Sequence, residues 1–261
     1  MIKVATYNIK NSSQTDAELD NWSYRRPNIL ALIKKQDWDV FGLQEVMADQ
    51  RADLIQALGA DYQLVGAVRD DSASGEYNPV LFKKDRFEEL QQDTFWLSAT
   101  PAVMSRTASW EAACFRIATW VRLRDRQTQQ ELLFINTHLD HVSPTAREKG
   151  AQVIADFIGQ QSDRNIFLTG DCNAEADEPF YQILTAQLQD VRRTVPHRVG
   201  PLKTCSSEDF TTHFDAATWV SIDYIFASTA VQATRVAVLT DRFHERFMSD
   251  HFPVTADVTL A

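Results

Sequence analysis

The sequence contains few of the residues that cross-link or interrupt a protein chain, with three cysteines, eight glycines and eight prolines among 261 residues. Cys114, Cys172 and Cys205 are too few, and odd in number, for a disulfide framework, and their spacing does not fit a zinc site. No linker rich in proline, glycine or serine and no repeat divides the chain. With 44% hydrophobic residues, we expect one large α/β domain over residues 1–261.

Long apolar runs are also missing, and no stretch approaches the length that crosses a membrane. The first residues, Met1 to Tyr7, are typical of a strand and lack the basic start, apolar centre and cleavage site of a signal peptide. These absences favour a cytoplasmic location without a membrane span. No segment of the sequence predicts a protein partner.

Positive charge is scarce, because 26 lysines and arginines stand against 36 acidic residues, for a formal net charge of −10. Proteins that grip long nucleic acids usually show a basic face, so this balance favours a short or small substrate over long duplex DNA. The same excess of carboxylates suits a protein that holds a divalent cation.

Apolar patterns predict many short strands and few helices. The clearest predicted helix runs from Pro144 to Ile158, with Ser143 as its N-cap and Pro144 in the first helical position. Two further helices are predicted, one opened by Pro27 and one over residues 48–58. Because several strands follow one another without helices, a mixed α/β sandwich fits better than a purely parallel sheet. Strands are predicted at residues 2–9, 40–45, 62–68, 79–83, 94–97, 116–123, 132–139, 165–169, 222–227, 236–239 and 254–260.

Polar residues recur where the apolar strands end, which is where α/β proteins usually place their sites. They combine carboxylates, amides and imidazoles, without an obvious serine or cysteine nucleophile. Carboxylates suit Mg²⁺ or Mn²⁺, and imidazoles and carboxylates transfer protons, so the set points to metal-assisted attack by water. The residues are Asn8, Glu45, His138, Asp171, Asn173, Asp223, Asp250 and His251.

Taken singly, these residues have ordinary explanations. Glu45 could end a strand that faces solvent, and Asp171 and Asn173 could be turn residues after a strand. Asp223 is harder to explain in this way, because it lies inside an apolar strand where an unpaired charge is costly.

Six motifs follow one another along the chain, and together they are more specific than any one of them, because short motifs recur by chance. They are Thr6-Tyr7-Asn8-Ile9, Leu43-Gln44-Glu45-Val46, Asn136-Thr137-His138-Leu139, Gly170-Asp171-Cys172-Asn173-Ala174, Ile222-Asp223-Tyr224-Ile225 and Ser249-Asp250-His251-Phe252-Pro253-Val254. In this order the motifs resemble the endonuclease/exonuclease/phosphatase superfamily over nearly the whole chain. Residues 95–98 and 110–120 resemble a bacterial branch of it.

The resemblance implies a DNase-I-like fold, which is a four-layer sandwich of two packed mixed β-sheets flanked by helices. It also implies a divalent metal, Mg²⁺ or Mn²⁺. Glu45 matches the main metal carboxylate of the family, with Asn8 close by. Asp250 is a candidate second metal ligand or a supporting acid.

The resemblance further implies catalytic roles. Asp171 matches the group that orients or deprotonates the attacking water, and Asn173 matches the amide that holds the phosphate. His251 matches the imidazole that contacts the phosphate, steadied by Asp223. A protonated His251 would stabilise the charge that builds on the phosphoryl oxygens.

His138 resembles the second histidine of the deoxyribonuclease and sphingomyelinase branches, where a glutamate pairs with it, and Glu76 is the best candidate for that partner. This pair favours hydrolysis of a phosphodiester, in a short nucleic acid or another small substrate. One alternative is a phosphomonoesterase acting on an inositol-phosphate-like or nucleotide substrate. Another is a catalytically silent binding module of the same fold.

A few more residues are candidates for substrate binding. Arg116 could contact a phosphate, although a buried structural ion pair explains it equally well. Trp22 and Arg26 could lie on a substrate-facing loop, but a packed helix start with a solvated arginine is slightly favoured. We expect Cys172 to pack in the core. His141 is expected to lie in a loop or to support the site.

Overall fold

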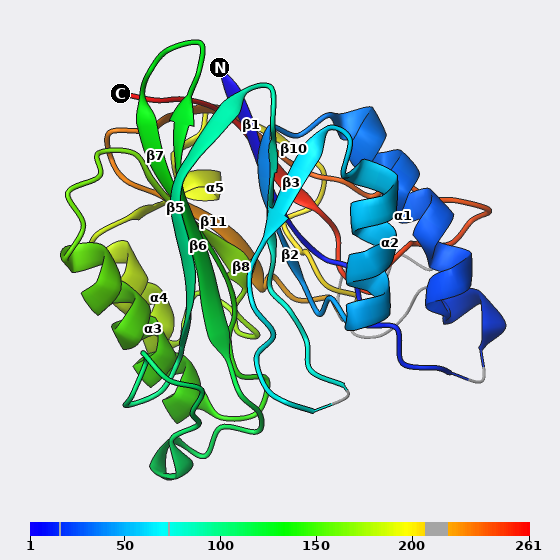
Figure 1. The fold of residues 1–261 in the computed structure, drawn as a ribbon, viewed down its shortest axis with the longest axis horizontal. Helices are drawn as coiled ribbons and strands as arrows, with labels where there is room; N and C mark the ends of the chain where they lie inside the picture. Colours follow the sequence, from blue (N-terminus) through cyan, green and yellow to red (C-terminus); the bar gives the residue numbers. More distant parts are fainter. Residues whose placement is uncertain (16, 73, 207–218) are drawn as a thin grey trace.

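The protein is described here by a computed structural model that covers residues 1–15, 17–72, 74–206 and 219–261. Within these residues the strands form two sheets (Figure 1). The first sheet has seven described strands, in the order β10 (His197–Val199), β12 (Gln232–Val238), β13 (Val254–Thr259), β1 (Ile2–Asn8), β2 (Val40–Gln44), β4 (Val80–Lys83) and β3 (Tyr62–Val65).

The second sheet has six strands in the part of the chain that the structure describes. Their order is β5 (Phe87–Trp96), β6 (Ile117–Asp125), β7 (Glu131–His138), β8 (Ile166–Asp171), β11 (Asp223–Ala227) and β9 (Gln189–Asp190). Strands β7 and β8 are parallel, whereas β5, β6 and β11 run antiparallel to their neighbours. In the first sheet β1 and β2 are parallel and β13 is antiparallel to β1, so both sheets are mixed, as predicted.

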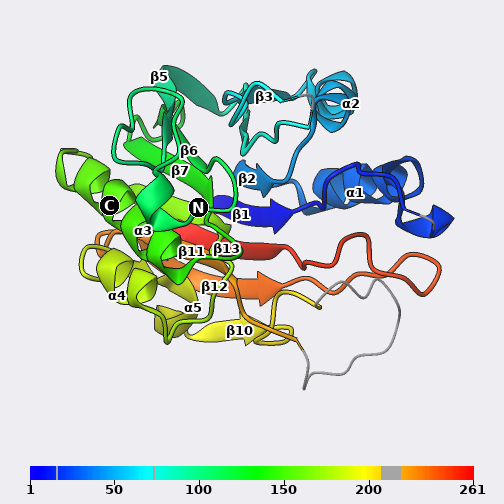
Figure 2. The same cartoon turned by 90° about the horizontal axis from the view of Figure 1, so that it is seen from below.

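Helices cover the outer faces of the two sheets, as the two orthogonal views show (Figures 1 and 2). Helices α1 (Trp22–Gln36) and α2 (Ala48–Leu58) lie against the first sheet, and α3 (Pro144–Gly159) and α4 (Pro179–Thr185) against the second. The short elements are α5 (Val191–Thr194) and the 3₁₀ turns η1 (Glu18–Asp20) and η2 (Ala108–Trp110). The four-layer sandwich is therefore confirmed. Among the described residues, no helix is both long and apolar enough to cross a membrane.

Alternation along the strands separates the hydrophobic interior into layers. Ile2 and Val4 of β1 point into the core between the sheets, while Ala5 and Tyr7 join the core under α1 and α2. Successive side chains of a strand point to opposite faces, so a strand covered on both sides is apolar throughout. All five residues of β2 are buried for this reason, which is why the inner strands were predictable from apolar runs.

Helix α1 and strand β5 differ most from their predicted bounds. Helix α1 begins at Trp22, five residues before Pro27, and keeps the proline inside it at the loss of one backbone hydrogen bond. Strand β5 begins at Phe87, well before the predicted start. Its first part was not predicted because the strand lies at the edge of its sheet, and its polar, largely exposed middle has no apolar pattern. By contrast, α2 has its predicted bounds and α3 differs by one residue, with the Ala146 N–H donating to Oγ of Ser143 at 3.1 Å.

The strand pairing brings the predicted polar residues to one end of the sandwich. Asn8 ends β1 and lies opposite Gln44 at the end of the parallel strand β2. In the other sheet His138 is paired in register with Asp171, and Asp171 with Asp223. The ends of neighbouring strands from both sheets therefore converge, although Asn8 and Asp171 are 163 positions apart in the sequence.

Candidate functional site

A pocket of about 370 Å³ lies at these strand ends, with lining residues from both sheets and from the loops between them. Asn8 and Asp223 do not line the pocket but contact residues that do. Eight of the predicted residues line it directly: Glu45, Glu76, Arg116, His138, Asp171, Asn173, Asp250 and His251.

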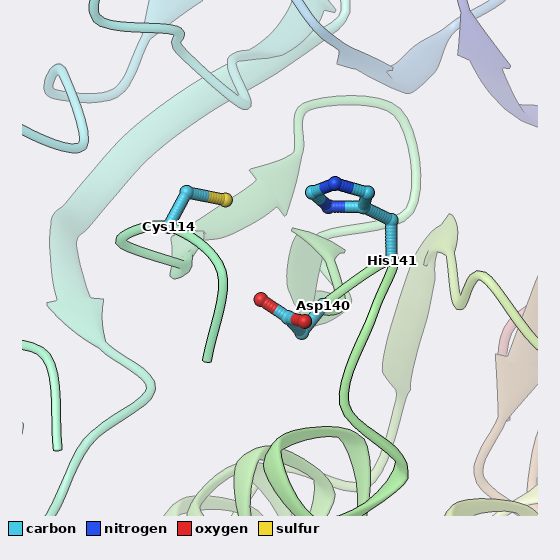
Figure 3. Close-up of side chains that lie close together, drawn as sticks. All are labelled: Cys114, Asp140 and His141. Atoms are coloured by element: carbon cyan, nitrogen blue, oxygen red, sulfur yellow. The ribbon is translucent and has the colours of Figure 1, made fainter. Parts of the chain in front are cut away.

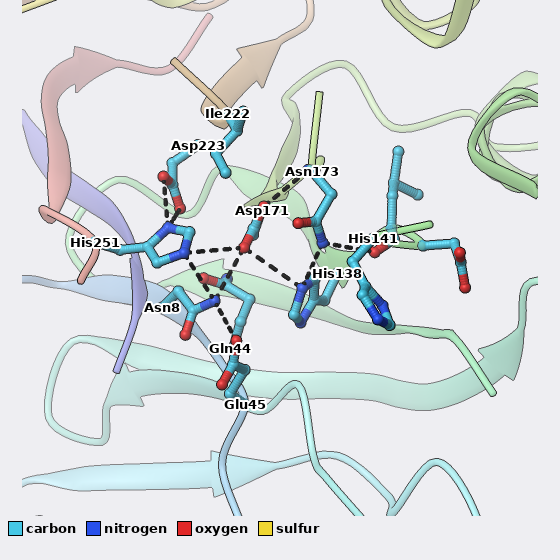
Figure 4. Close-up of polar contacts among 12 residues, drawn as sticks. Asn8, Gln44, Glu45, His138, His141, Asp171, Asn173, Ile222, Asp223 and His251 are labelled. Carbon is cyan, nitrogen blue, oxygen red and sulfur yellow. Dashed lines mark hydrogen bonds and ion pairs between the residues drawn. The ribbon is translucent and has the colours of Figure 1, made fainter. Parts of the chain in front are cut away.

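Asp171 is the centre of the polar contacts at the bottom of this pocket (Figure 4). Nδ2 of Asn8 donates to Oδ2 of Asp171 at 2.9 Å, and Nε2 of His251 and of His138 lie 3.5 and 3.4 Å from the same oxygen. The backbone N–H of Asn173 donates to the other oxygen, Oδ1, at 2.8 Å. Burial raises the pKa of Asp171 to about 7, although His251 and these hydrogen bonds oppose the change. A carboxylate with this pKa can accept a proton at near-neutral pH.

His251 forms a buried pair with Asp223. The carboxylate oxygens of Asp223 lie 2.9 and 3.2 Å from Nδ1 of His251. Burial alone would lower the pKa of His251, but the carboxylates of Asp223 and Asp171 outweigh it and raise the pKa well above its usual value. His251 is therefore an imidazolium near neutrality, oriented by Asp223 and directed toward Asp171 (Figure 4).

Glu45 follows β2 with a positive φ of 61°, a backbone conformation that costs a residue with a Cβ about 1 kcal/mol or more. This conformation directs its half-buried carboxylate into the pocket. Oε1 accepts from Nδ2 of Asn8 at 3.0 Å, and Oε2 accepts from the backbone and side-chain nitrogens of Asn11 at 3.0 and 2.9 Å. All of these partners are neutral amides, so the charge of Glu45 is not neutralised by them.

Asp250 faces the same pocket and pairs with Lys10, whose Nζ lies 2.8 Å from its Oδ2. Burial alone would raise the pKa of Asp250, but His251 and Lys10 outweigh it and lower the pKa. Lys10 and Asn11 were not predicted, because they follow the first motif in a loop whose path the sequence does not reveal. With one oxygen bound to Lys10, Asp250 is placed as a supporting acid more readily than as a ligand.

The predicted pairing of His138 with Glu76 is wrong. Glu76 instead pairs with Arg69, whose Nη1 lies 2.5 Å from Oε2 of Glu76. His138 is buried, its Nε2 accepts from Nδ2 of Asn173 at 2.8 Å, and its Nδ1 has no hydrogen-bond partner. Burial, together with the charges of Arg116 and His251, holds the pKa of His138 well below its usual value. A guanidinium attracts Glu76 more strongly than this neutral imidazole does, which explains the exchange of partners.

Asn173 has a positive φ of 52°, which turns its side chain back across the end of β7. Its Nδ2 donates to Leu139 O at 3.0 Å as well as to His138. The amide group therefore braces the pocket wall in addition to facing the pocket, where it was predicted to hold phosphate.

Trp22 and Arg26 do not line the pocket. Nε1 of Trp22 donates to Asp53 of α2 at 2.8 Å, and Nη1 of Arg26 lies 2.9 Å from the other oxygen of that carboxylate. The favoured explanation, a packed helix start, is therefore confirmed, although Arg26 is paired. The substrate-facing loop is wrong, because Asp53 holds both side chains against the neighbouring helix.

Arg25, the residue between them, organises the site and was not predicted. Its guanidinium is buried and donates to five backbone carbonyls, those of Ile9, Lys10, Asn11, Asp20 and Met248, at 2.5 to 3.1 Å. Two loops that carry site residues, one after β1 and one before β13, are thereby tied together. The sequence does not predict this role, because backbone carbonyl groups are the same in every residue.

Two groups of side chains among the described residues have the spacing of a metal site. The first is Asp171, Asp223 and His251, in which His251 stands between the two carboxylates. The second is Cys114, Asp140 and His141 (Figure 3). In the second group Asp140 accepts from the backbone N–H groups of Ala113, Val142 and Ser143, each at 2.9 Å. This carboxylate therefore holds a loop together, and His141 lies in that loop.

The residues of the pocket fit a divalent cation better near Glu45 than at either group. Glu45 is a hard oxygen donor that faces the pocket without an ion pair to any described residue, and Asn8 orients it. His251, by contrast, is positively charged, and His141 lies against the Arg116 guanidinium at 3.0 Å. Cys172 is buried in the core under α3 and α4, as predicted.

The sandwich and its acid–imidazole centre define a DNase-I-like protein. The family model of the endonuclease/exonuclease/phosphatase family matches residues 5–251, and the chain belongs to that family. A mannosyl-6-phosphatase of Bacteroides thetaiotaomicron has 31% identity and a TM-score of 0.91, with both chains covered in full. A family member from Bacteroides vulgatus has 33% identity and a TM-score of 0.92, covering 100% of this chain and 99% of the other.

More distant solved structures share the fold. The human nocturnin catalytic domain with a bound sulfate anion has 20% identity and a TM-score of 0.77, covering 100% of this chain and 94% of that one. The comparison with curated proteins gave no match. Family membership supports hydrolysis of a phosphoester bond.

Proposed function

We propose that the protein hydrolyses a phosphate ester by activating water, with Mg²⁺ or Mn²⁺ held at Glu45, near Asn8 and Asp250. The observation that carries this proposal is the contact of buried Asp171 with His251, itself paired with Asp223, next to an uncompensated Glu45 carboxylate. When bound, the cation would polarise a phosphoryl oxygen and offset its charge.

The residues of the chain would divide the remaining work. Asp171 accepts the proton of the attacking water, whose oxygen bonds to phosphorus while the ester P–O bond breaks. His251 stabilises the charge on the phosphoryl oxygens, and Asp223 holds the ring in place. Asn8 orients both Glu45 and Asp171, from which its Nδ2 lies 3.0 and 2.9 Å.

A phosphomonoester is the substrate class that the pocket supports better. The pair of His138 and Glu76 favoured a phosphodiester, and that pair is not formed. The pocket instead presents several cations, including Lys10, Arg69 and Arg116, in a chain of net charge −10. The similar Bacteroides protein that acts as a mannosyl-6-phosphatase adds support for a sugar phosphate.

A phosphodiester is the second candidate, because His138 lies beside both Asp171 and Asn173, where the nuclease branches have a second histidine. A silent binding module is disfavoured, because the acids and imidazoles are held in mutual contact at one pocket.

The test is hydrolysis of mannose 6-phosphate, p-nitrophenyl phosphate, bis-(p-nitrophenyl) phosphate and single-stranded RNA, each with Mg²⁺, Mn²⁺ or EDTA. We expect metal-dependent hydrolysis of the monoesters that is lost in His251→Ala. His197→Ala is the matched control, because His197 is exposed on β10. Turnover that survives EDTA, or a folded His251→Ala variant with normal turnover, would contradict the proposal.

A further inference from the structure

Arg116 is a buried cation whose charge is not matched by a carboxylate. Only 7% of the residue is exposed, although it lines the pocket. Nη2 lies 3.0 Å from Nδ1 of His141, while Nε has no hydrogen-bond partner. Among the described residues, no carboxylate lies within ion-pair distance of Arg116. The structural ion pair considered from the sequence is therefore not formed.

Its neighbour Arg69 shows what a compensated arginine in the same pocket looks like. Arg69 has carboxylate oxygens of Glu76 and Asp70 at 2.5 and 3.4 Å. The partner of Arg116 is instead an imidazole whose pKa is lowered, first by burial and then by Arg116 itself, so it is neutral near pH 7. A buried charge without a partner is costly unless an anion completes it.

The backbone holds Arg116 in a fixed position beside the chemistry. Leu97 N donates to its carbonyl oxygen at 2.8 Å, and the next residue begins β6, which pairs with β7. In that register β6 meets β7 close to His138, and the Arg116 charge is one of the causes that lower the His138 pKa. His138 Nδ1 is the second buried group here without a partner.

We propose that Arg116 binds the second negative charge of the scissile phosphate and thereby selects phosphomonoester dianions over phosphodiesters. The inference rests on the proposed hydrolysis and names the substrate class of the same pocket. A monoester dianion offers three terminal oxygens that share two negative charges, whereas the second ester group of a diester replaces one of these oxygens and removes one charge. A buried guanidinium therefore binds the monoester dianion more strongly than the diester monoanion.

The first test uses two substrates with one leaving group, p-nitrophenyl phosphate and methyl p-nitrophenyl phosphate. We expect Arg116→Met to lower kcat/KM for the monoester about 10- to 100-fold and for the diester less than about threefold. Arg116→Lys should recover part of the loss. Arg124→Met is the matched control, since Arg124 is an arginine of the adjoining strand β6 that pairs with Glu88 and Glu131. Equal losses for the two substrates would overturn the proposal.

The second test needs no turnover and separates the two proposals. Calorimetry with inorganic phosphate in EDTA should show binding to the wild type that is at least about tenfold weaker in Arg116→Met. Equal phosphate affinity in both proteins would overturn the role of Arg116. If this difference is present but no ester is hydrolysed, the anion site stands and the proposed hydrolase fails. The melting temperature of Arg116→Met should not fall, because no ion pair is lost.

Discussion

Two side-chain groups in this protein have almost the same composition but opposite uses. Asp171, Asp223 and His251 form one, and Asp140 and His141, with Cys114, form the other (Figures 3 and 4). In the first group both carboxylates face the imidazole of His251, and Asp171 also lines the pocket. In the second, Asp140 directs both oxygens to backbone N–H groups. The partners of the carboxylate oxygens, and not the residue types, therefore distinguish the proposed reactive centre from a carboxylate that braces a loop.

The same substitution in the two groups should separate activity from stability. We expect Asp171→Asn to lower kcat/KM about 10²- to 10⁴-fold, because the amide cannot accept the proton of water. Its melting temperature should stay the same or rise, since a buried carboxylate with a raised pKa is removed. Steady-state kinetics and thermal unfolding of one preparation measure both effects. A folded variant with normal turnover would remove Asp171 from the mechanism.

Glu45→Gln should act on the metal requirement. Because Glu45 offers an uncompensated carboxylate to the pocket, its loss should raise the Mg²⁺ concentration for half-maximal activity about 10- to 100-fold. Glu76→Gln is the matched control, since Glu76 lines the pocket but is bound to Arg69. A metal titration that shifts equally in both variants would mean that Glu45 is not the principal ligand.

Asp140→Asn should lower the stability of the fold and largely keep turnover, whereas Asp171→Asn should lower turnover and keep stability. Asp140 accepts three N–H groups with its two oxygens, whereas asparagine has only one accepting oxygen. We therefore expect the free energy of unfolding to fall by about 1–3 kcal/mol. Turnover per folded molecule should change less than about tenfold. Urea unfolding with activity measured in parallel gives both numbers. If turnover per folded molecule fell by much more than about tenfold, Asp140 and His141 would belong to the reaction.

The stability difference between wild type and Asp140→Asn should depend on pH. Burial alone would raise the pKa of Asp140, but the Ser143 and Val142 N–H groups and Arg116 outweigh it, so the pKa is lowered. A lowered carboxyl pKa stabilises the folded protein above the unfolded value of about 3.9, and this contribution is lost as the pH falls through the folded value. The two unfolding free energies should therefore converge on acidification below pH of about 4. A constant difference would contradict this account.

The smallest effect is expected far from both groups, at Asp53. This carboxylate holds Trp22 and Arg26 and joins α1 to α2, but Arg26 is exposed enough for solvent to weaken the pair. Asp53→Ala should cost about 1 kcal/mol of stability and leave kcat/KM unchanged. A clear loss of activity in this variant would revive the substrate-facing loop, which was the less favoured alternative from the sequence.

The inner strands and the polar residues at their ends were predictable from the sequence for one physical reason. Strands buried on both faces are apolar throughout, and a charged residue at their ends is conspicuous, as Asp223 and Asp171 are. The exposed edge strand β5 has no such pattern, and its residues 87–93 were missed. The short elements β9, β10, α4 and α5 were not predicted either.

Side-chain partnerships were less predictable than positions. Glu76 was placed in the pocket correctly but with the wrong partner, because the competing Arg69 lies in a loop that sequence patterns do not orient. The five hydrogen bonds described for Arg25 all go to backbone carbonyls, which have no residue-type signature in a sequence. Arg116 was left between two explanations until its lack of a carboxylate became visible in the structure.

The central claim is that water, deprotonated by Asp171, attacks the phosphorus of a phosphate ester. Hydrolysis of mannose 6-phosphate in water labelled with heavy oxygen tests it most directly, with wild type and Asp171→Asn compared in Mg²⁺. We expect one labelled oxygen in each released phosphate, none at O6 of the sugar, and a rate that collapses in the variant. Label at O6 of the sugar, or equal rates in the two proteins, would contradict this mechanism.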